Sequence, residues 1–245
     1  MKSNPSTRLN KAVSILFGCS RRDADEYIKL GLIKLNGKIV DNLSTYVSKN
    51  DSVSFDGENK KLLDVPRDSK LWIYYKPQGL ITTHKDEKGR KTVFSDIRKK
   101  IKERVVSVGR LDINSEGLLL ITTDGEFQKF AESPQTGWKR VYHVRVFGDI
   151  NDEKINIIKK GVEIEGIQYG PMSIKNITKK NKDGIMSKNV WLECSIREGK
   201  NREIRRIFSH FGIQVNRLIR KQYGPYKIGI LQPGDIQEVP FPKNM

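Results

Sequence analysis

The chain has 245 residues, which is enough for two domains or one large one and for a substantial hydrophobic core. Hydrophobic residues make up 36% and charged residues 31%, and no apolar run approaches the length that a bilayer requires, so the composition predicts a soluble globular protein and excludes a transmembrane one. The formal net charge of +17, from 46 basic and 29 acidic residues, favours a polyanionic partner, with nucleic acid ahead of a membrane surface.

Residues that bind metals or form disulfides are scarce. Cys19 and Cys194 lie far apart in the sequence, which argues against a disulfide framework and against a cysteine zinc site. The three histidines show no metal-ligand spacing. Residues 1–7 lack the apolar core of a signal peptide. We therefore predict a protein of the reducing cytoplasm that holds no metal.

Two short helices are predicted first. Apolar residues recur at helical spacing over residues 9–17, and Gly18 is placed to end that helix. Ser20 has an acid, Asp23, three positions later, a pattern that resembles a capping box and predicts the start of a second helix. Gly31 is placed to end this helix.

A hairpin follows the two helices. Asn36-Gly37 between apolar residues is a strong signal for a tight hairpin turn, and a further pair of strands is indicated by Val47, Val53 and Phe55. This order resembles the small αL RNA-binding domain first seen in ribosomal protein S-four, over residues 6–56. The resemblance implies that this domain binds structured RNA mainly through its phosphates, with contacts from Arg8, Arg21 and Arg22. The alternative is a generic helical hairpin with solvated basic residues.

A second domain is predicted from residue 70, after a polar linker at residues 57–69 that contains Pro66. Residues 71–75 are aromatic and β-branched, which predicts a strand. For Lys76, which follows it, contact with RNA and a solvated position in a turn are both open. Residues 84–104 are highly charged and are predicted to form a loop and a short amphipathic helix.

The centre of the chain contains a polar loop between two apolar segments. Val105-Val106 and residues 118–121 are predicted to be buried strands. Between them Arg110 and Asp112 are two residues apart, so in an extended backbone their side chains point the same way. An ionised carboxylate held by a guanidinium suits a nucleophile or a base. An ordinary salt bridge, or an aspartate that accepts hydrogen bonds within its own turn, fits the same pattern.

The next elements are less specific. Residues 125–132 and 150–161 are predicted to be helical, and residues 179–184 a solvated hairpin tip. Residues 141–146 alternate as in a strand, with Tyr142 on the same face as Val144 and Val146. The pattern by itself favours a core position for Tyr142.

The last distinctive segment is a strand at residues 191–196 followed by a helix. The apolar side of this helix carries Ile204, Phe208 and Phe211. From Lys200 to Lys221 there are seven basic residues and one acidic residue. This excess of positive charge is larger than in an ordinary solvated helix, where both signs are mixed.

Two strings resemble the signatures of the RsuA-like family of pseudouridine synthases, RNA enzymes that convert uridine into its carbon-linked isomer. The first runs from Gly109 to Gly125 and contains Gly-Arg-Leu-Asp, Glu-Gly-Leu-Leu-Leu and Thr-Asp-Gly; the second is Glu-Gly-Lys-Asn-Arg-x-Ile-Arg-Arg at residues 198–206. Glu203 stands where the family usually has glutamine. The resemblance implies an α+β fold, in which the small αL domain precedes a mixed, mainly antiparallel sheet with flanking helices at residues 70–245.

The family resemblance also implies roles for individual residues. Asp112 corresponds to the catalytic aspartate, Arg205 to its buried ion-pair partner, and Tyr142 to a ring that stacks on the target uracil. Leu218 corresponds to a wall of the uracil pocket, although a plain core leucine fits as well. Contacts to the RNA are implied for Arg110, in the gap left by a flipped base, and for Lys200, Arg202 and Arg206 at phosphates.

The implied substrate is one uridine of ribosomal RNA, free or in a pre-ribosomal particle, and the motifs look closer to the large-subunit enzymes than to the small-subunit one. Asp112 would either attack the sugar or remove a ribose proton. The isomerisation exchanges no electrons overall, so no cofactor is expected, and the sequence has no P-loop or dinucleotide fingerprint. We expect a monomer. The alternatives are a small-subunit rRNA pseudouridine synthase, a non-catalytic ribosome-assembly factor that binds RNA, and another class of RNA enzyme, such as a nuclease, which would usually need acids clustered around metal ions.

Overall fold

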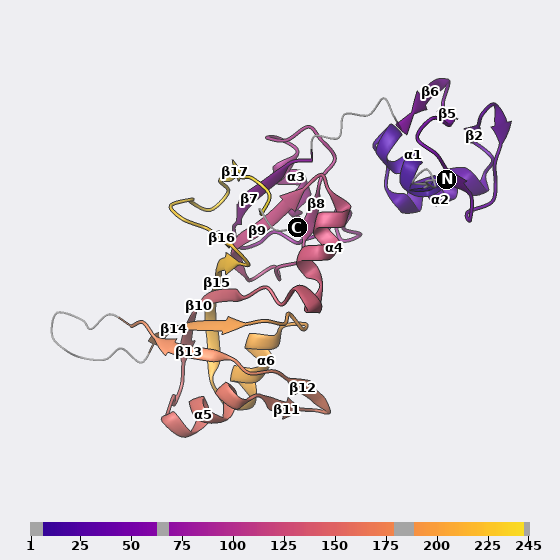
Figure 1. Ribbon diagram of the computed structural model, residues 1–245. Coiled ribbons are helices and arrows are strands. Elements are labelled where there is room, and N and C mark those ends of the chain that lie inside the picture. Colours follow the sequence, from indigo (N-terminus) through magenta and orange to yellow (C-terminus); the bar gives the residue numbers. More distant parts are fainter. Residues whose placement is uncertain (1–6, 63–68, 179–188, 243–245) are drawn as a thin grey trace. The chain divides into compact units, whose positions relative to one another are not determined.

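The computed structural model describes residues 7–62, 69–178 and 189–242. The chain forms two compact units, within residues 1–68 and 69–245 (Figure 1). In the described part of the chain, no helix is long and apolar enough to cross a membrane.

The first unit is built on two short helices whose ends match the sequence signals. Gly18 follows the first helix with φ 68°, a left-handed conformation that glycine adopts without strain. The Ser20 hydroxyl accepts from Asp23 N at 3.0 Å and the Asp23 carboxylate accepts from Ser20 N at 2.9 Å, so the capping box is confirmed. The elements of this unit are β1 (Thr7–Arg8), α1 (Leu9–Phe17), α2 (Arg21–Lys29), β2 (Lys34–Leu35), β3 (Lys38–Ile39), β4 (Tyr46–Val47), β5 (Ser52–Phe55) and β6 (Glu58–Lys61).

The strands of the first unit confirm one prediction and correct two. Asn36 and Gly37 have φ 52° and 83° and turn the β2–β3 hairpin as expected. The two strands predicted around Val47 and Val53 are present as β4 and β5, but they do not pair with each other, because β4 pairs with β1 whereas β5 pairs with β2 and β6. Residues 58–61, predicted to be linker, form β6 on the edge of this sheet. Residues 63–68 of the predicted linker lie outside the described residues.

The second unit is a mixed sheet with helices on both sides. Its elements are β7 (Leu71–Lys76), α3 (Val93–Ile97), β8 (Val106–Val108), β9 (Glu116–Thr122), α4 (Gly125–Glu132), the 3₁₀ turn η2 (Pro134–Thr136), β10 (Arg140–Phe147), α5 (Asp152–Lys160), β11 (Val162–Ile164), β12 (Ile167–Tyr169), β13 (Ser173–Asn176), β14 (Asn189–Ile196), α6 (Glu203–His210), β15 (Gln214–Tyr223), β16 (Tyr226–Lys227) and β17 (Ile236–Glu238).

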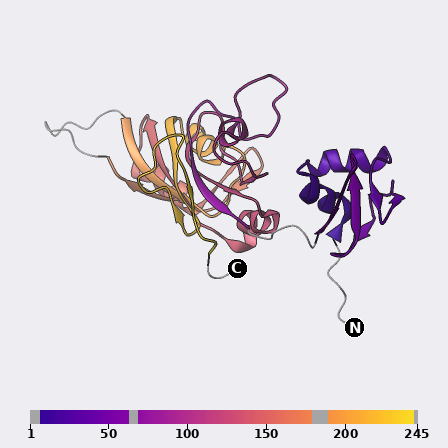
Figure 2. The same ribbon diagram turned by 90° about the horizontal axis from the view of Figure 1, so that it is seen from above.

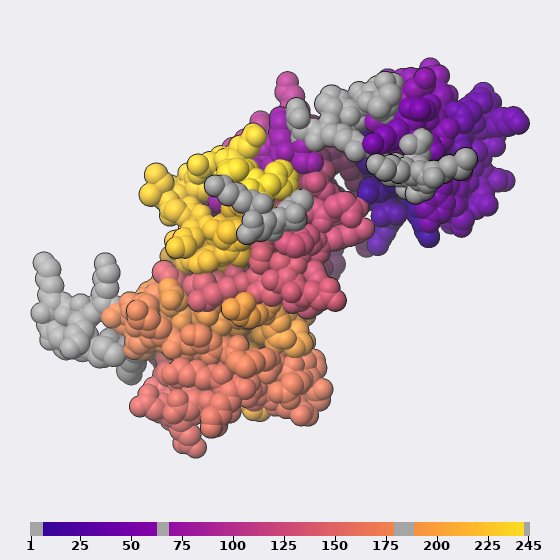
Figure 3. All heavy atoms as spheres, viewed as in Figure 1, coloured from indigo at the N-terminus to yellow at the C-terminus, as the bar shows by residue number. Residues whose placement is uncertain are grey.

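The described strands of this sheet follow the order β13-β14-β10-β15-β9-β7-β17, with β16 beside β15 and β8 beside β9. Only the pairing of β15 with β9 is parallel among these named strands. The predicted α+β class is therefore confirmed. Because β17 pairs with β7, residues 236–238 lie beside the start of the second unit, as the yellow and purple atoms in Figure 3 show.

Both faces of the central strands are buried, which explains their nearly continuous apolar sequence. Trp72 and Tyr74 of β7 join one core cluster with α3, α5 and α6, whereas Ile73 and Tyr75 join a second cluster with α4. The strands lie side by side as one sheet in Figure 2. The predicted helix at residues 125–132 is α4, and the predicted hairpin tip at residues 179–184 lies outside the described residues.

Candidate active site

Asp112 lies in the loop between β8 and β9, at the junction of the central strands. Gly109 opens this loop with φ 67°, and its N–H donates to Glu132 Oε1 at 2.7 Å. The Asp112 carbonyl accepts from Ser115 N at 3.0 Å, which closes a turn. The Asp112 side chain is 31% exposed, so a ligand can reach its carboxylate.

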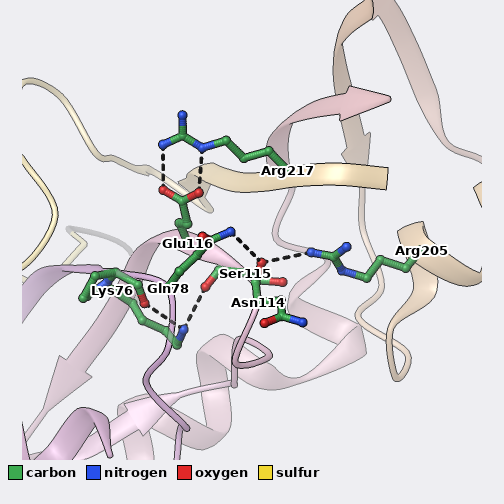
Figure 4. A network of polar contacts seen from close by, with 8 residues as sticks. Lys76, Gln78, Asn114, Ser115, Glu116, Arg205 and Arg217 are labelled. Carbon is green, nitrogen blue, oxygen red and sulfur yellow. Dashed lines mark hydrogen bonds and ion pairs between the residues drawn. The ribbon is translucent and has the colours of Figure 1, made fainter. Parts of the chain in front are cut away.

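Three consecutive carbonyl groups after Asp112 are held by donors from outside the loop. These donors come from the last residue of β7, from the segment after β7 and from α6, which approach the loop from different directions (Figure 4). The hydrogen bonds run from Gly79 N to Ile113 O at 2.9 Å, from Gln78 Nε2 and Arg205 Nη2 to Asn114 O at 3.3 and 3.0 Å, and from Lys76 Nζ to Ser115 O at 2.8 Å. On the other side of Asp112, the Thr82 hydroxyl donates to Leu111 O at 2.8 Å. The backbone on both sides of Asp112 is thus fixed.

Lys76 occupies a place that neither sequence-based alternative predicted. Its side chain is fully buried, and Nζ also donates to Pro77 O at 3.0 Å. Burial lowers the pKa of Lys76 to about 8, with nearby Asp112 and Glu116 acting in the opposite direction. In this structure Lys76 supports the Asp112 loop from inside the protein and does not reach the surface.

The guanidinium that pairs with Asp112 is that of Arg202, whose Nη1 lies 3.7 Å from Asp112 Oδ2. The predicted pairing with Arg205 is therefore wrong for this structure. Arg205 is half-buried and its terminal nitrogens already donate to Asn114 O and, at 3.0 Å, to Val215 O. Desolvation lowers the pKa of Arg205, Arg202 acts in the same direction, and Asp112 opposes both. Arg205 thus anchors the loop and contributes to the field at Asp112 from a distance.

A second ion pair adjoins the loop and was not predicted. Arg217 on β15 binds Glu116 on β9 through Nε at 2.6 Å and Nη2 at 2.8 Å. The Glu116 residue is 4% exposed, so this two-point contact compensates a buried carboxylate. Glu116 belongs to the first quoted motif string, but Arg217 lies 101 positions further along the chain. No local signal could have paired them.

Tyr142 and Leu218 are buried in the same core cluster as Leu111 of the loop. They come from the neighbouring strands β10 and β15, where Val144 faces Leu218 and Tyr142 faces Arg220 in register. Tyr142 is 7% exposed and Leu218 is 6% exposed. The alternation that placed Tyr142 with Val144 and Val146 on one face is confirmed.

Basic side chains surround the loop on the α6 side. A groove of about 660 Å³ is lined by three arginines and one acid among its charged side chains, namely Arg202, Arg205, Arg206 and Glu165, and also by His210. Arg110, Arg202 and Arg206 are exposed. Lys200 forms an ion pair with Glu198, and its Nζ lies 5.8 Å from the centre of the Tyr169 ring. This surface suits a polyanion.

The three arginines predicted to bind RNA in the first unit are exposed there. The Arg8 guanidinium lies 5.9 Å from the centre of the Tyr46 ring, and Arg21 Nη2 donates to Asn10 Oδ1 at 3.2 Å. Arg22 is exposed one position further along α2.

Taken together, the second unit presents a reachable carboxylate on a fixed loop, a basic rim and a nearby apolar cluster. Within residues 7–62, 69–178 and 189–242, no three histidine, cysteine or acidic side chains are grouped so that they could hold a metal ion. The carboxylate can act as a nucleophile or a base towards a group brought into this site.

Comparison with known proteins identifies the chemistry. Residues 70–210, more than half of the chain, match the family model described as RNA pseudouridylate synthase. The chain belongs to this family. Residues 7–53 match the S4 domain model, so this pseudouridine synthase carries an RNA-binding domain of that type ahead of its catalytic domain.

Individual relatives agree with this assignment. An RNA pseudouridine synthase of Rickettsia bellii (strain RML369-C) is 49% identical over 232 residues, covering 95% of this chain and 96% of the relative. Ribosomal large subunit pseudouridine synthase B of Escherichia coli O157:H7 is 35% identical over 247 residues, covering 98% and 77% of the two chains. A crystal structure of a pseudouridylate synthase shares the fold, with a TM-score of 0.64, 23% identity and coverage of 95% and 96%. The synthase is thus an isomerase that acts on RNA, of the type formed by the RsuA-like enzymes and ribosomal large subunit pseudouridine synthase B.

Proposed function

We propose that this synthase isomerises one specific uridine of large-subunit ribosomal RNA and that Asp112 is the catalytic group. The substrate is supported by the name of the Escherichia coli relative, which is similar over nearly the whole of this chain. The basic groove and the net charge of +17 are consistent with a large structured RNA as the ligand.

The observation that carries the role of Asp112 is the anchoring of its loop. Its carboxylate is exposed enough to meet a ligand, whereas the carbonyl groups that follow it are bound by donors from β7 and α6. A reacting group must be held within a fraction of an ångström of its productive position, and such anchoring provides this. Arg202 keeps the carboxylate oriented before the RNA binds.

The target uridine must leave the RNA stack to reach Asp112, at a cost of a few kcal/mol. Arg110 is exposed three residues before the anchored carbonyls and is proposed to fill the gap that the base leaves. Tyr142 and Leu218 are proposed to form the apolar floor of the uracil pocket. Lys200, Arg202 and Arg206 are proposed to bind phosphates, as are Arg8, Arg21 and Arg22 of the first unit.

The reaction breaks the bond from uracil N1 to the sugar C1′ and forms a bond from C5 to the same carbon. Asp112 begins it either by attacking C1′ or by removing a ribose proton. The detached uracil turns within the pocket and its C5 bonds to C1′. This step displaces Asp112 from C1′ if Asp112 had attacked that carbon; if Asp112 had removed a ribose proton, it returns that proton to the sugar. C5 then loses its proton, and N1 gains one. Atoms and electrons balance without a co-reactant, and we propose that no cofactor takes part.

We further propose that the synthase acts as a monomer in the cytoplasm. Cys19 and Cys194 form no disulfide, and Cys194 is buried, where burial raises the pKa of its thiol and keeps it unreactive.

The test is to incubate the protein and its Asp112→Asn variant with large- and small-subunit rRNA transcripts from the same organism. Pseudouridines are mapped by carbodiimide treatment and primer extension. One new stop in the large-subunit RNA, lost in the variant, is expected, and the asparagine should reduce the single-turnover rate by about 10⁴-fold or more because it can neither attack nor accept a proton. Glu163→Asn, an exposed acid outside the site, serves as the control.

A stop confined to small-subunit RNA would overturn the substrate assignment and leave the role of Asp112 intact. Full activity of Asp112→Asn would overturn that role. Tight binding without any stop on naked or ribosomal-particle RNA would favour a ribosome-assembly factor.

A further inference from the structure

The turn that carries Arg202 is held by a pair of carboxyl groups. Glu198 lies at its start and Glu203 at its end, where α6 begins. Glu203 Oε2 accepts from Lys200 N at 3.0 Å, and Glu203 N donates back to Lys200 O at 3.2 Å. Glu198 Oε1 accepts from Gly170 N at 2.6 Å, while its other oxygen is paired with Lys200 Nζ. Side chain and backbone therefore close this turn together.

One of the two carboxyl oxygens of Glu203 is buried and has no hydrogen-bond donor. The residue is 3% exposed, and its Oε1 has no hydrogen-bond partner if the carboxyl group is ionised. The Glu198 carboxyl group lies within hydrogen-bonding reach of it. Two adjacent carboxylates repel each other, but a single shared proton turns the repulsion into a hydrogen bond.

We propose that Glu203 is a positioning residue that works as a neutral acid: its protonated carboxyl group donates to Glu198 and accepts from the Lys200 amide, and so holds the turn that brings Arg202 to Asp112. Burial raises the pKa of Glu203 from 4.5 to about 8, and the Glu198 charge acts in the same direction. The pKa of Glu198 is lowered, although its own burial opposes this, because Gly170 N, Lys200 and Glu203 all hydrogen-bond to it. The proton thus belongs to Glu203.

The consequence for the active site follows from the backbone. Arg202 precedes Glu203 and has φ 51° and ψ 29°, a left-handed conformation that costs a non-glycine residue energy and persists only where neighbouring contacts impose it. Arg205 lies two residues further on and anchors Asn114 O. Loss of the Glu203 proton would release the restraint on both arginines. This inference rests on the proposed role of Asp112.

The charged groups that act on the Glu203 carboxyl are Glu198 and Lys200, both from the turn. The neighbouring segment after β12 contributes the Gly170 N–H to Glu198, and β12 contributes the Tyr169 ring beside Lys200. Lys76 titrates in the same pH range but belongs to a different part of the site. A comparison of variants at Glu203 is therefore needed to separate the two groups.

The experiment measures the single-turnover rate of tritium release from an rRNA transcript labelled at uracil C5, between pH 6.5 and 9.5. The wild-type rate should fall about tenfold from pH 7 to pH 9, because each pH unit above a pKa reduces the protonated fraction tenfold. Glu203→Gln keeps both hydrogen bonds with a group that does not titrate. It should match the wild type within about threefold at pH 7 and lose no more than about twofold by pH 9.

Two further variants make the result specific. Glu203→Leu lacks both contacts and should be about tenfold slower than the wild type at pH 7, with a rate that changes by no more than about twofold up to pH 9, where the two proteins become similar. Glu163→Gln neutralises an exposed acid on β11, next to α6, and should keep the wild-type profile. An alkaline fall that is the same in Glu203→Gln as in the wild type would overturn the proposal and assign the fall to another group. No tritium release from the wild type at any pH would instead overturn the proposed rRNA substrate.

Thermal unfolding gives an independent readout that needs no RNA. The folded protein keeps a proton that the unfolded chain releases near pH 4.5, so this group makes the free energy of unfolding fall as pH rises from about 4.5 to 8 and then level off. The melting temperature of Glu203→Gln should decline less than that of the wild type across this window. Parallel curves for the two proteins would contradict a raised pKa at Glu203.

Discussion

At the scale of single residues, the loop that carries Asp112 is held by side chains that bind its backbone carbonyl groups. Lys76 is the clearest example, because a fully buried ammonium group contributes two hydrogen bonds to backbone carbonyls beneath the loop. Burying a lysine costs free energy, and the lowered pKa reports that cost. The buried Lys76 holds the backbone of the Asp112 loop in one geometry.

Lys76→Met is expected to test this role. Methionine fills a similar volume but leaves the Ser115 and Pro77 carbonyls without their donor, which costs about 1–3 kcal/mol for an unpaired buried polar group. The single-turnover rate should fall about tenfold or more because a small shift of the loop misplaces Asp112. Lys175→Met, at an exposed position on β13, is the matched control. Its single-turnover rate should be within about twofold of the wild-type rate, because surface substitutions away from such contacts have small effects. Equal rates for the two variants would remove Lys76 from the positioning of Asp112.

At the scale of elements, the parallel junction of β9 with β15 joins the first signature string to a strand near the end of the chain. Gly117 sits at this parallel pairing with φ 103°, and a Cβ atom there would lie 2.3 Å from Arg220 O. Only glycine allows the strands to approach this closely. The Glu116–Arg217 ion pair lies beside the same junction.

Gly117→Ala is therefore expected to be severely destabilising, by about 3 kcal/mol or more, because it adds a steric clash to an unfavourable φ angle. Urea unfolding followed by circular dichroism measures the change. Gly125→Ala at the start of α4 meets no atom within 4 Å and has no positive φ angle, so it should be neutral or stabilise by up to about 1 kcal/mol. Similar unfolding midpoints for the two alanine variants would show that the close approach is unimportant.

The ion pair itself gives a second prediction at this scale. Arg217→Met strands a buried carboxylate and should lower the free energy of unfolding by about 2–3 kcal/mol. The double variant Glu116→Gln with Arg217→Met removes the stranded charge and should recover part of that loss. Lys154→Met breaks an ion pair with Asp149, whose side chain is 76% exposed, and should cost less than about 1 kcal/mol. A loss for Arg217→Met as small as that for Lys154→Met would mean that Glu116 is not effectively buried.

At the scale of the whole molecule, each of the two compact units has exposed arginines, which we propose bind phosphates of the RNA. Phosphate contacts release counterions, so affinity for rRNA should fall steeply with salt, by about 10³-fold or more between 50 and 200 mM if six or more phosphates are contacted. Arg22→Gln should reduce the slope of log K against log salt by about 1, whereas Arg22→Lys keeps the charge and should keep the slope. Filter binding over this salt range measures both, and an unchanged slope for Arg22→Gln would exclude Arg22 from the interface.

The sequence by itself determined the local features, because each depends on a few adjacent residues. The capping box at Ser20, the Asn36-Gly37 turn, the helix at residues 125–132 and the buried strand after Asp112 were all predictable from spacing and residue type. The two signature strings also predicted the family, since their length makes a chance match improbable.

Only the tertiary structure decided the contacts between distant segments. Three examples are the pairing of β4 with β1, the burial of Lys76, and the contact of Asp112 with Arg202 in place of Arg205. Each depends on the order of the strands and on which donors lie close to the loop in the folded chain. Glu116 and Arg217 meet across 101 positions because β9 and β15 are neighbours in the sheet. Contacts between such distant residues produce no periodic pattern in the sequence. A guanidinium can bind either a backbone carbonyl or a carboxylate, and only the packing of the strands decides which of the two lies within its reach.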